Sequence, residues 1–213
     1  MTDESINWIE RFEQAKDRYG GGKGRDLDQR QLTQLGNAAW AAGLALLMAG
    51  RGEEAADWLR TAAGRYRESW DAGAPPDSWG RPIAAMKALL VAGDDADEAA
   101  RWALDAGAAG AESPIGRYAA TLALLVLGRD GAAVPVAATL RDGFPEDVAT
   151  ALAAIAVHDA SAYANAVERV LRSFEERDEF LEDMPVADTA LVLDRLARER
   201  GLSDGLRASP RLP

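Results

Sequence analysis

Apolar residues recur at every third or fourth position along most of the chain, which is the spacing typical of helices. Residues 31–49 carry two such stripes, Leu32, Leu35, Ala39, Ala42, Leu46 and Ala49 on one and Trp40, Leu44 and Leu47 on the other. We therefore expect this helix to be buried on two faces between neighbouring helices. After the turn AGRGEE, a second helical stripe follows, formed by Ala55, Leu59, Ala62, Tyr66 and Trp70. Two helices joined by a glycine turn make a helical hairpin.

The hairpin is repeated along the chain. The stretch AGRGEEAADWL at 49–59 reappears as AGDDADEAARWAL at 92–104, and a third copy is LLVLGRDGAAVPVAATL at 124–140. A looser fourth copy runs from Pro145 to about Arg177 around a turn at His158–Asp159. A last helix is expected over about 186–200, where Gly201 would end it.

No segment alternates with a period of two, so the sequence predicts an all-α fold. We expect a short right-handed α-solenoid of about four degenerate, tetratricopeptide-like hairpins, with an N-terminal helix and a C-terminal capping helix. Residues 1–213 form a single domain in this interpretation, divided into a helix at 1–19, a flexible glycine-rich link at 20–27, hairpins at 28–200 and a tail at 201–213. Pro82 and Pro114 are expected in first helical turns, with Ser113 as an N-cap.

The glycine run YGGGKGRDL at 19–27 invites comparison with phosphate-binding loops. A Walker loop needs a glycine five positions before the Gly-Lys pair and a hydroxyl residue after it, between a strand and a helix. The corresponding residues are Asp17 and Gly24, and a helix over about Glu4 to Tyr19 precedes the run instead of a strand. We therefore predict a flexible link and no nucleotide site.

Charge narrows the classes of partner. The chain has 35 acidic and 24 basic residues, a net charge of -11, and only three of its basic residues are lysines. This balance argues against nucleic-acid binding, and a salt-tolerant or halophilic source would explain it.

The chain contains no cysteine, which excludes disulfides and thiolate metal sites. No apolar run is long enough to span a membrane, so we expect a soluble, cytoplasmic protein.

Two polar features are candidates for a chemical site. His158 is the only histidine, and its place at a turn favours a structural role at a helix end. The segment EERDEFLED at 175–183 contains six acidic residues that could bind a cation or act as an acid and base. Because a calcium-loop spacing is absent, a solvated acidic helix end is the preferred interpretation. We predict no catalytic, cofactor or metal residue.

The tryptophans suggest a binding surface instead of a reaction. Trp79 lies in the proline-rich connection PPDSWGRP and belongs to no helical stripe. It either caps the core or anchors a partner, because tryptophan and arginine are favoured at interface hot spots. The candidate partner-binding residues are Trp70, Trp79, Arg81 and Arg117.

The C-terminal third resembles the end of the immunity protein 49 family of bacterial polymorphic toxin systems. The resemblance rests on a helix pair around a turn aspartate, an LArerGl-type helix and a Ser-Pro-x-Leu-Pro tail, and the matching residues are Asp159, Ala166, Leu171, Pro185, Leu191, Leu193, Leu196, Ala197, Arg198, Gly201, Ser209, Pro210, Leu212 and Pro213. Arg211 stands where that family has a tyrosine. The resemblance implies an all-α protein that neutralises a partner toxin without chemistry of its own, and it transfers no functional residues.

These observations predict a non-enzymatic, protein-binding helical-repeat module that uses its concave groove or its loops. An immunity-like protein facing a basic toxin, such as a nuclease, is the most specific version, because opposite charges favour association. A tetratricopeptide-type scaffold or adaptor is the main alternative. A metal- or metabolite-binding protein that uses residues 175–183 is the minor alternative.

Overall fold

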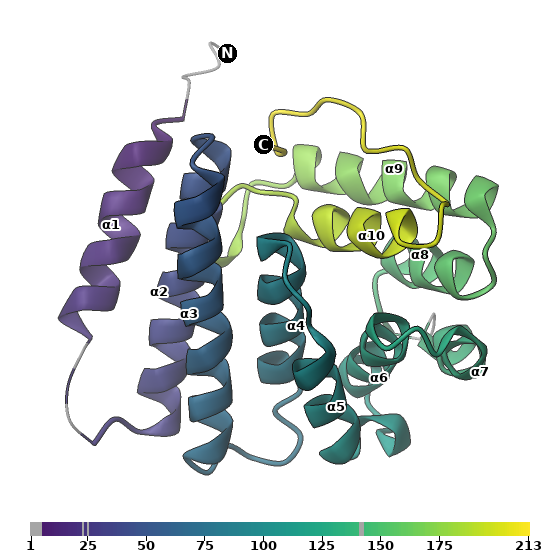
Figure 1. The fold of residues 1–213 in the computed structure, drawn as a ribbon, viewed down its shortest axis with the longest axis horizontal. Coiled ribbons are helices and arrows are strands. Elements are labelled where there is room, and N and C mark those ends of the chain that lie inside the picture. Colours follow the sequence, from purple (N-terminus) through teal and green to yellow (C-terminus); the bar gives the residue numbers. More distant parts are fainter. Residues whose placement is uncertain (1–5, 23, 25, 141–142) are drawn as a thin grey trace.

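The computed structural model describes residues 6–22, 24, 26–140 and 143–213, and these contain helices but no strand (Figure 1). The predicted all-α fold is therefore confirmed. The α-helices of this part are α1 (Trp8–Gly21), α2 (Gln29–Met48), α3 (Gly52–Asp71), α4 (Gly80–Ala92), α5 (Asp97–Asp105), α6 (Pro114–Val126), α7 (Asp130–Leu140), α8 (Glu146–Ala156), α9 (Ala160–Glu176) and α10 (Asp188–Arg198). Two short 3-10 helices, η1 (Ala108–Gly110) and η2 (Leu181–Asp183), lie in connections.

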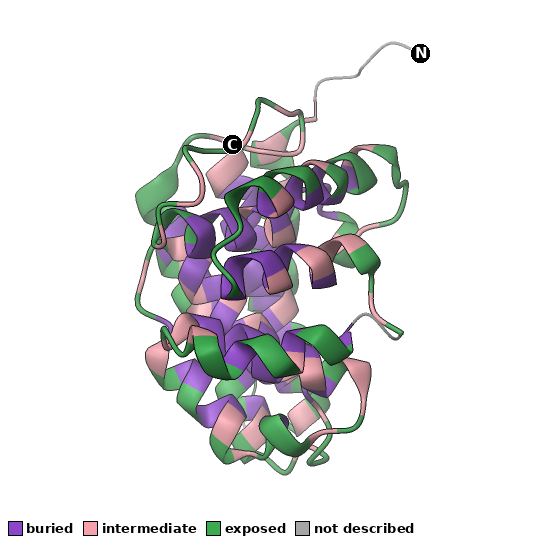
Figure 2. Ribbon diagram, turned by 90° about the vertical axis from the view of Figure 1, so that its right-hand side faces the viewer, coloured by how far each residue is buried: buried purple, intermediate pink, exposed green. Residues whose placement is uncertain are grey.

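Helices that follow one another in the chain pack side by side from α1 to α9, as a helical repeat requires. Helix α2 lies between α1 and α3 (Figure 1), and it is buried along nearly its whole length. This confirms the predicted burial on two faces. Figure 2 shows that the helices nearest its viewer turn exposed residues outward and buried residues toward the interior. At Gly43 the backbones come so close that an added Cβ would lie 2.7 Å from Leu59 Cγ. Small residues thus set the α2–α3 distance.

Local capping explains where several helices begin. Asp28 accepts hydrogen bonds from the Arg30 and Gln31 amides, while the Gln31 side chain accepts one from the Asp28 amide, so α2 starts with a capping box. Ser113 caps α6 by accepting a hydrogen bond from the Gly116 amide, and Pro114 is the first residue of that helix, as predicted.

The N-terminal helix differs from its prediction. It begins at Trp8, because Asn7 accepts a hydrogen bond from the Glu10 amide and caps it, and it continues through Gly20 and Gly21. The first two glycines of the run are therefore helical and do not belong to a link. Helix propagation overcomes the weak helix propensity of two glycines when the preceding turns are packed. Lys23 and Arg25 lie outside the described residues, so the predicted flexibility of the rest is untested.

Helix α10 does more than cap the last hairpin. It contacts α8 and α9, as expected for a cap, and it also packs on α4. Figure 1 shows it between α4 and the α8–α9 hairpin. Helix α10 thus connects the α4–α5 hairpin to the α8–α9 hairpin.

Candidate partner-binding groove

The predicted tryptophans lie in an aromatic cluster within the fold. Trp79 precedes α4 and is 7% exposed. Its ring lies 6.2 Å from that of Trp70, which in turn meets Trp102 edge-on at 5.6 Å. Gly116 leaves room for this cluster, since a Cβ there would lie 2.9 Å from Trp79 Nε1. Of the two alternatives for Trp79, the structure supports the core position, so its indole is not offered to a partner.

The two predicted arginines each join helices through hydrogen bonds. Arg81 Nε donates a hydrogen bond to Ser69 Oγ over 2.7 Å, and its Nη2 donates to Gln29 Oε1. Arg117 Nη1 donates to the Thr139 carbonyl on α7 over 3.2 Å. The four residues therefore do not form one binding site. Trp70 and Trp79 are brought together, whereas Arg81 and Arg117 bind backbone and side-chain groups of other elements.

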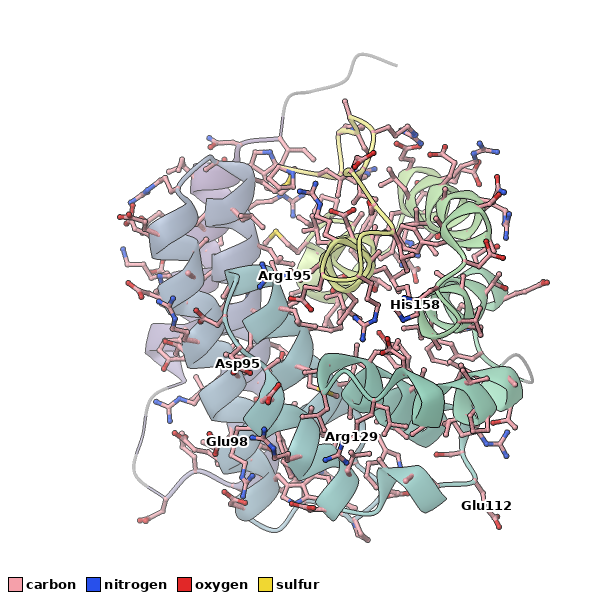
Figure 3. All side chains as sticks on the ribbon, turned by 45° about the vertical axis from the view of Figure 1, so that its right-hand side comes forward. Asp95, Glu98, Glu112, Arg129, His158 and Arg195 are labelled. Atoms are coloured by element: carbon pink, nitrogen blue, oxygen red, sulfur yellow. The ribbon has the colours of Figure 1, made fainter. Side chains whose placement is uncertain are left out.

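His158 has the structural role that its position in the sequence indicated. Its Nε2 lies 2.7 Å from Asp130 Oδ2, so the α8–α9 turn is tied to the start of α7. Asp130 also accepts hydrogen bonds from Arg200, which follows α10 and donates to the Leu125 carbonyl as well. In Figure 3, His158 lies between the α8–α9 hairpin and the helices next to it. The hydrogen bonds from Arg200 and His158 lower the pKa of Asp130, although its partial burial opposes them.

The acidic segment 175–183 does not gather into a metal site. Within the residues that the structure describes, no group of three or more His, Asp or Glu side chains could hold a metal ion. Glu175 binds the C-terminal tail, and Glu182 lies 3.4 Å from Arg18 of α1. Asp178 and Asp183 line a groove that the sequence did not indicate.

This groove has a volume of about 810 Å³ and lies between α1, the α9–α10 connection and the tail. Helix α1 buries Phe12, Ala15 and Tyr19 and turns its polar face to the groove. The charged lining residues are Glu10, Arg11 and Arg18 from α1, Arg177, Asp178, Glu182 and Asp183 from the connection, and Arg211 from the tail. Segments from both ends of the chain thus form one open, charged surface.

The connection is held against α1 in a strained conformation. Arg11 Nη1 donates a hydrogen bond to the Asp183 carbonyl, beside the ion pair of Arg18 with Glu182. Glu182 and Asp183 both have a φ of 55°, in the left-handed region that costs residues other than glycine about 1–2 kcal/mol each. Strain of this kind persists where surrounding contacts determine the backbone, and it clusters at functional sites.

Two guanidinium groups of the groove lie near the Phe180 ring. The Cζ of Arg177 lies 3.7 Å from the centroid of Phe174 and 5.9 Å from that of Phe180. The Cζ of Arg211 lies 5.1 Å from the Phe180 centroid, and its Nε is buried without a hydrogen-bond partner among the described residues. Neither arginine forms an ion pair with a residue in the described ranges. Arg11 also lacks an ion pair there, but its guanidinium group donates to the Asp183 carbonyl.

The C-terminal tail positions Arg211. Arg207 binds Glu168 at 2.9 Å and Glu175 at 2.8 Å, both on α9, and Ser209 Oγ donates to Glu175 over 2.7 Å. The Ala187 amide donates a hydrogen bond to the Arg211 carbonyl over 2.8 Å. These contacts hold the last residues over α9 and the start of α10, so Arg211 reaches the groove from a fixed backbone.

The tail contact should depend on pH in a defined range. Hydrogen bonds from Arg207 and then Ser209 lower the pKa of Glu175 to about 2. Because the folded pKa lies below the unfolded value, the contact contributes its full stability above about pH 4.5 and loses it as the pH falls toward 2. We expect the Glu175 carboxyl carbon to titrate near pH 2 in an NMR experiment. Glu175→Gln should increase hydrogen exchange of the Leu212 amide, whereas Glu176→Gln at the exposed neighbour should not. Equal exchange in both variants would contradict this role.

Sequence reasoning missed the groove because its residues come from three distant segments. The signals were present singly: Arg211 departs from the tail pattern of the resembled family, and Arg11 and Arg18 recur on one face of α1.

None of the described helices combines the length and the hydropathy needed to cross a membrane. No protein-family model, curated protein or solved structure matches this chain.

Proposed function

We propose that this protein is a non-enzymatic helical-repeat module that binds a protein partner in the groove between α1, the α9–α10 connection and the tail. The groove and its composition carry this proposal. Small-molecule pockets are enclosed and mainly apolar, whereas this groove is open and lined mostly by charged side chains. Arginines next to aromatic rings are frequent at protein interfaces, and Arg177 lies against Phe174 while Arg211 lies near Phe180.

Within this class we propose an immunity-like role, in which binding neutralises a toxin in the cytoplasm. The residues of the family resemblance lie in the C-terminal third, which supplies one wall of the groove through Pro185 and the tail. The net charge of -11 would speed association with a basic toxin through long-range attraction. No step of this function needs a catalytic group.

A scaffold or adaptor role is the second candidate, and one observation favours it. Val134 and Val157 are 37% and 57% exposed beside a second groove of about 390 Å³ lined by Ala138, Ala153 and Ala162. An adaptor needs a second protein-binding surface, and exposed apolar side chains around a groove suit that use.

A tagged pull-down from the native host at low and high salt tests the proposal. One stoichiometric basic partner encoded next to this gene is expected, and salt should weaken its capture because screening reduces long-range attraction. Several partners from one assembly would favour the adaptor role. If no protein is captured at either salt, the protein-binding function is wrong.

A further inference from the structure

We infer that Arg177 and Arg211 bind a carboxylate presented by a segment of the protein partner, and this inference rests on the proposed function. Both guanidinium groups lie within 6 Å of the Phe180 ring centroid, at 5.9 and 5.1 Å. Both side chains line the same groove, and no described carboxylate pairs with either. A bound carboxylate would supply the missing counter-ion.

The chemistry of the two arginines fits a carboxylate. A guanidinium group offers a planar set of N–H donors that matches the two oxygens of a carboxylate. Phe174 and Phe180 lie against these groups, so less conformational freedom is lost when an acceptor binds. The Arg211 Nε has no acceptor among the described residues, so no internal hydrogen bond of this atom competes with a ligand for the guanidinium group.

The other charged residues of the groove determine which partner residues can flank that carboxylate. Glu10, Asp178 and Asp183 line the same groove, and none of them forms an ion pair with a described residue. They would repel a run of acidic residues and attract basic ones. The occupant is therefore a partner segment in which an acidic residue lies between basic residues. This pattern is compatible with a basic partner, whose overall charge brings it to the acidic protein while one carboxylate sets the register.

Fluorescently labelled peptides test the inference with the full-length protein. The probe is an octapeptide of alternating lysine and glutamate, and the control peptide replaces each glutamate with glutamine. General attraction to an acidic protein would favour the control peptide, because its net positive charge is larger. Recognition of the carboxylate instead predicts tighter binding of the lysine–glutamate peptide, measured by fluorescence anisotropy. Equal or tighter binding of the glutamine peptide would overturn the inference.

Variants assign the binding to the two arginines. The double variant Arg177→Gln and Arg211→Gln should bind the lysine–glutamate peptide at least roughly tenfold more weakly, as expected when charge-assisted hydrogen bonds are lost. Arg129→Gln is the matched control, because Arg129 is an exposed arginine on the α6–α7 turn, outside the groove (Figure 3). Similar losses in both proteins would overturn the assignment.

A measurement on the wild-type protein avoids dependence on the folding of the variants. The Nε–Hε NMR signal of Arg211 should shift when the lysine–glutamate peptide is added, because a carboxylate bound to the guanidinium group changes the environment of this N–H. An unchanged signal at saturation would contradict direct contact. Inorganic phosphate at the same concentration should not displace the peptide, and displacement would show a site for free anions instead of a partner segment. If a partner captured from the host binds the double variant as well as the wild type, this inference fails while the proposed function stands.

Discussion

Replacing Ala42 with phenylalanine should destabilise the protein by about 3 kcal/mol or more, through overpacking of a contact that has no free space. Ala42 is fully buried in α2, and the neighbouring Gly43 approaches α3 so closely that even a methyl group would collide with Leu59. For a chain of this length, the melting temperature should fall by roughly 6–12 °C, as measured by circular dichroism.

The same substitution on the exposed side of α2 provides the control. Gln34 is exposed, so Gln34→Phe adds an equal ring to the same helix without filling the core. We expect its free energy of unfolding to change by no more than about 0.5 kcal/mol. An unchanged melting temperature for Ala42→Phe would mean that α2 is not packed between α1 and α3 in solution.

Replacing Asp188 with asparagine should have the other large effect, a loss of about 3 kcal/mol, because it leaves a mostly buried lysine without its counter-ion. Lys87 Nζ on α4 lies 2.7 Å from Asp188 Oδ2 on α10 and 3.1 Å from Thr189 Oγ1, and the two charged side chains are each only 16% exposed. This pair joins α10 to the hairpins. Urea unfolding at pH 7 measures the loss.

The pH dependence of the Asp188→Asn variant identifies the cause. In the wild type, burial lowers the pKa of Lys87, but the charge of Asp188 and its hydrogen bond outweigh this and raise it. The pair therefore stabilises the fold below about pH 10.4 and loses this effect as the pH rises through the folded pKa. Without Asp188, the effect of burial dominates, and the pKa of Lys87 in the folded protein drops below its value in the unfolded chain. The variant should then become more stable, relative to the wild type, between pH 7 and about pH 9.5.

A double replacement separates the lost charge balance from lost packing. Lys87→Met together with Asp188→Leu removes both charges and keeps side chains of similar size. Replacing a buried ion pair in this way is often neutral or stabilising, so we expect a stability within about 1 kcal/mol of the wild type. A double variant as unstable as Asp188→Asn would show that packing around α10, and not the unpaired lysine, causes the loss.

Local patterns were sufficient to predict most of the helices. The turn at His158–Asp159 and the N-cap at Ser113 were predicted because both depend on residues that are close in sequence. The start of the first helix was less predictable, since the residue types at Asn7 and before it are compatible with a helix and with a loop. The continuation through Gly20 and Gly21 depends on the packing of the preceding turns against α2 and α3, which no local pattern reports.

The candidate site was not predictable in the same way. Trp79 was a reasonable anchor in the sequence because a loop tryptophan has no helical stripe, but the space left at Gly116 gives it a place in the core. Arg177 and Arg211 are 34 positions apart in the sequence and line the same groove, each within 6 Å of the Phe180 centroid, at 5.9 and 5.1 Å. A pairing of this kind depends on how the tail returns over α9.

The sequence by itself determined that this protein is all-helical, where most of its hairpins turn, and that it has a net charge of -11. These properties follow from the spacing of apolar residues, from caps and from composition, all of which act over a few residues or over the whole chain. The tertiary structure decided that α10 packs on both α4 and the α8–α9 hairpin and that a groove forms between the first helix and the tail. The physical reason is that both depend on contacts between residues far apart in the chain. Such contacts form only where the folded structure brings complementary surfaces and charges together.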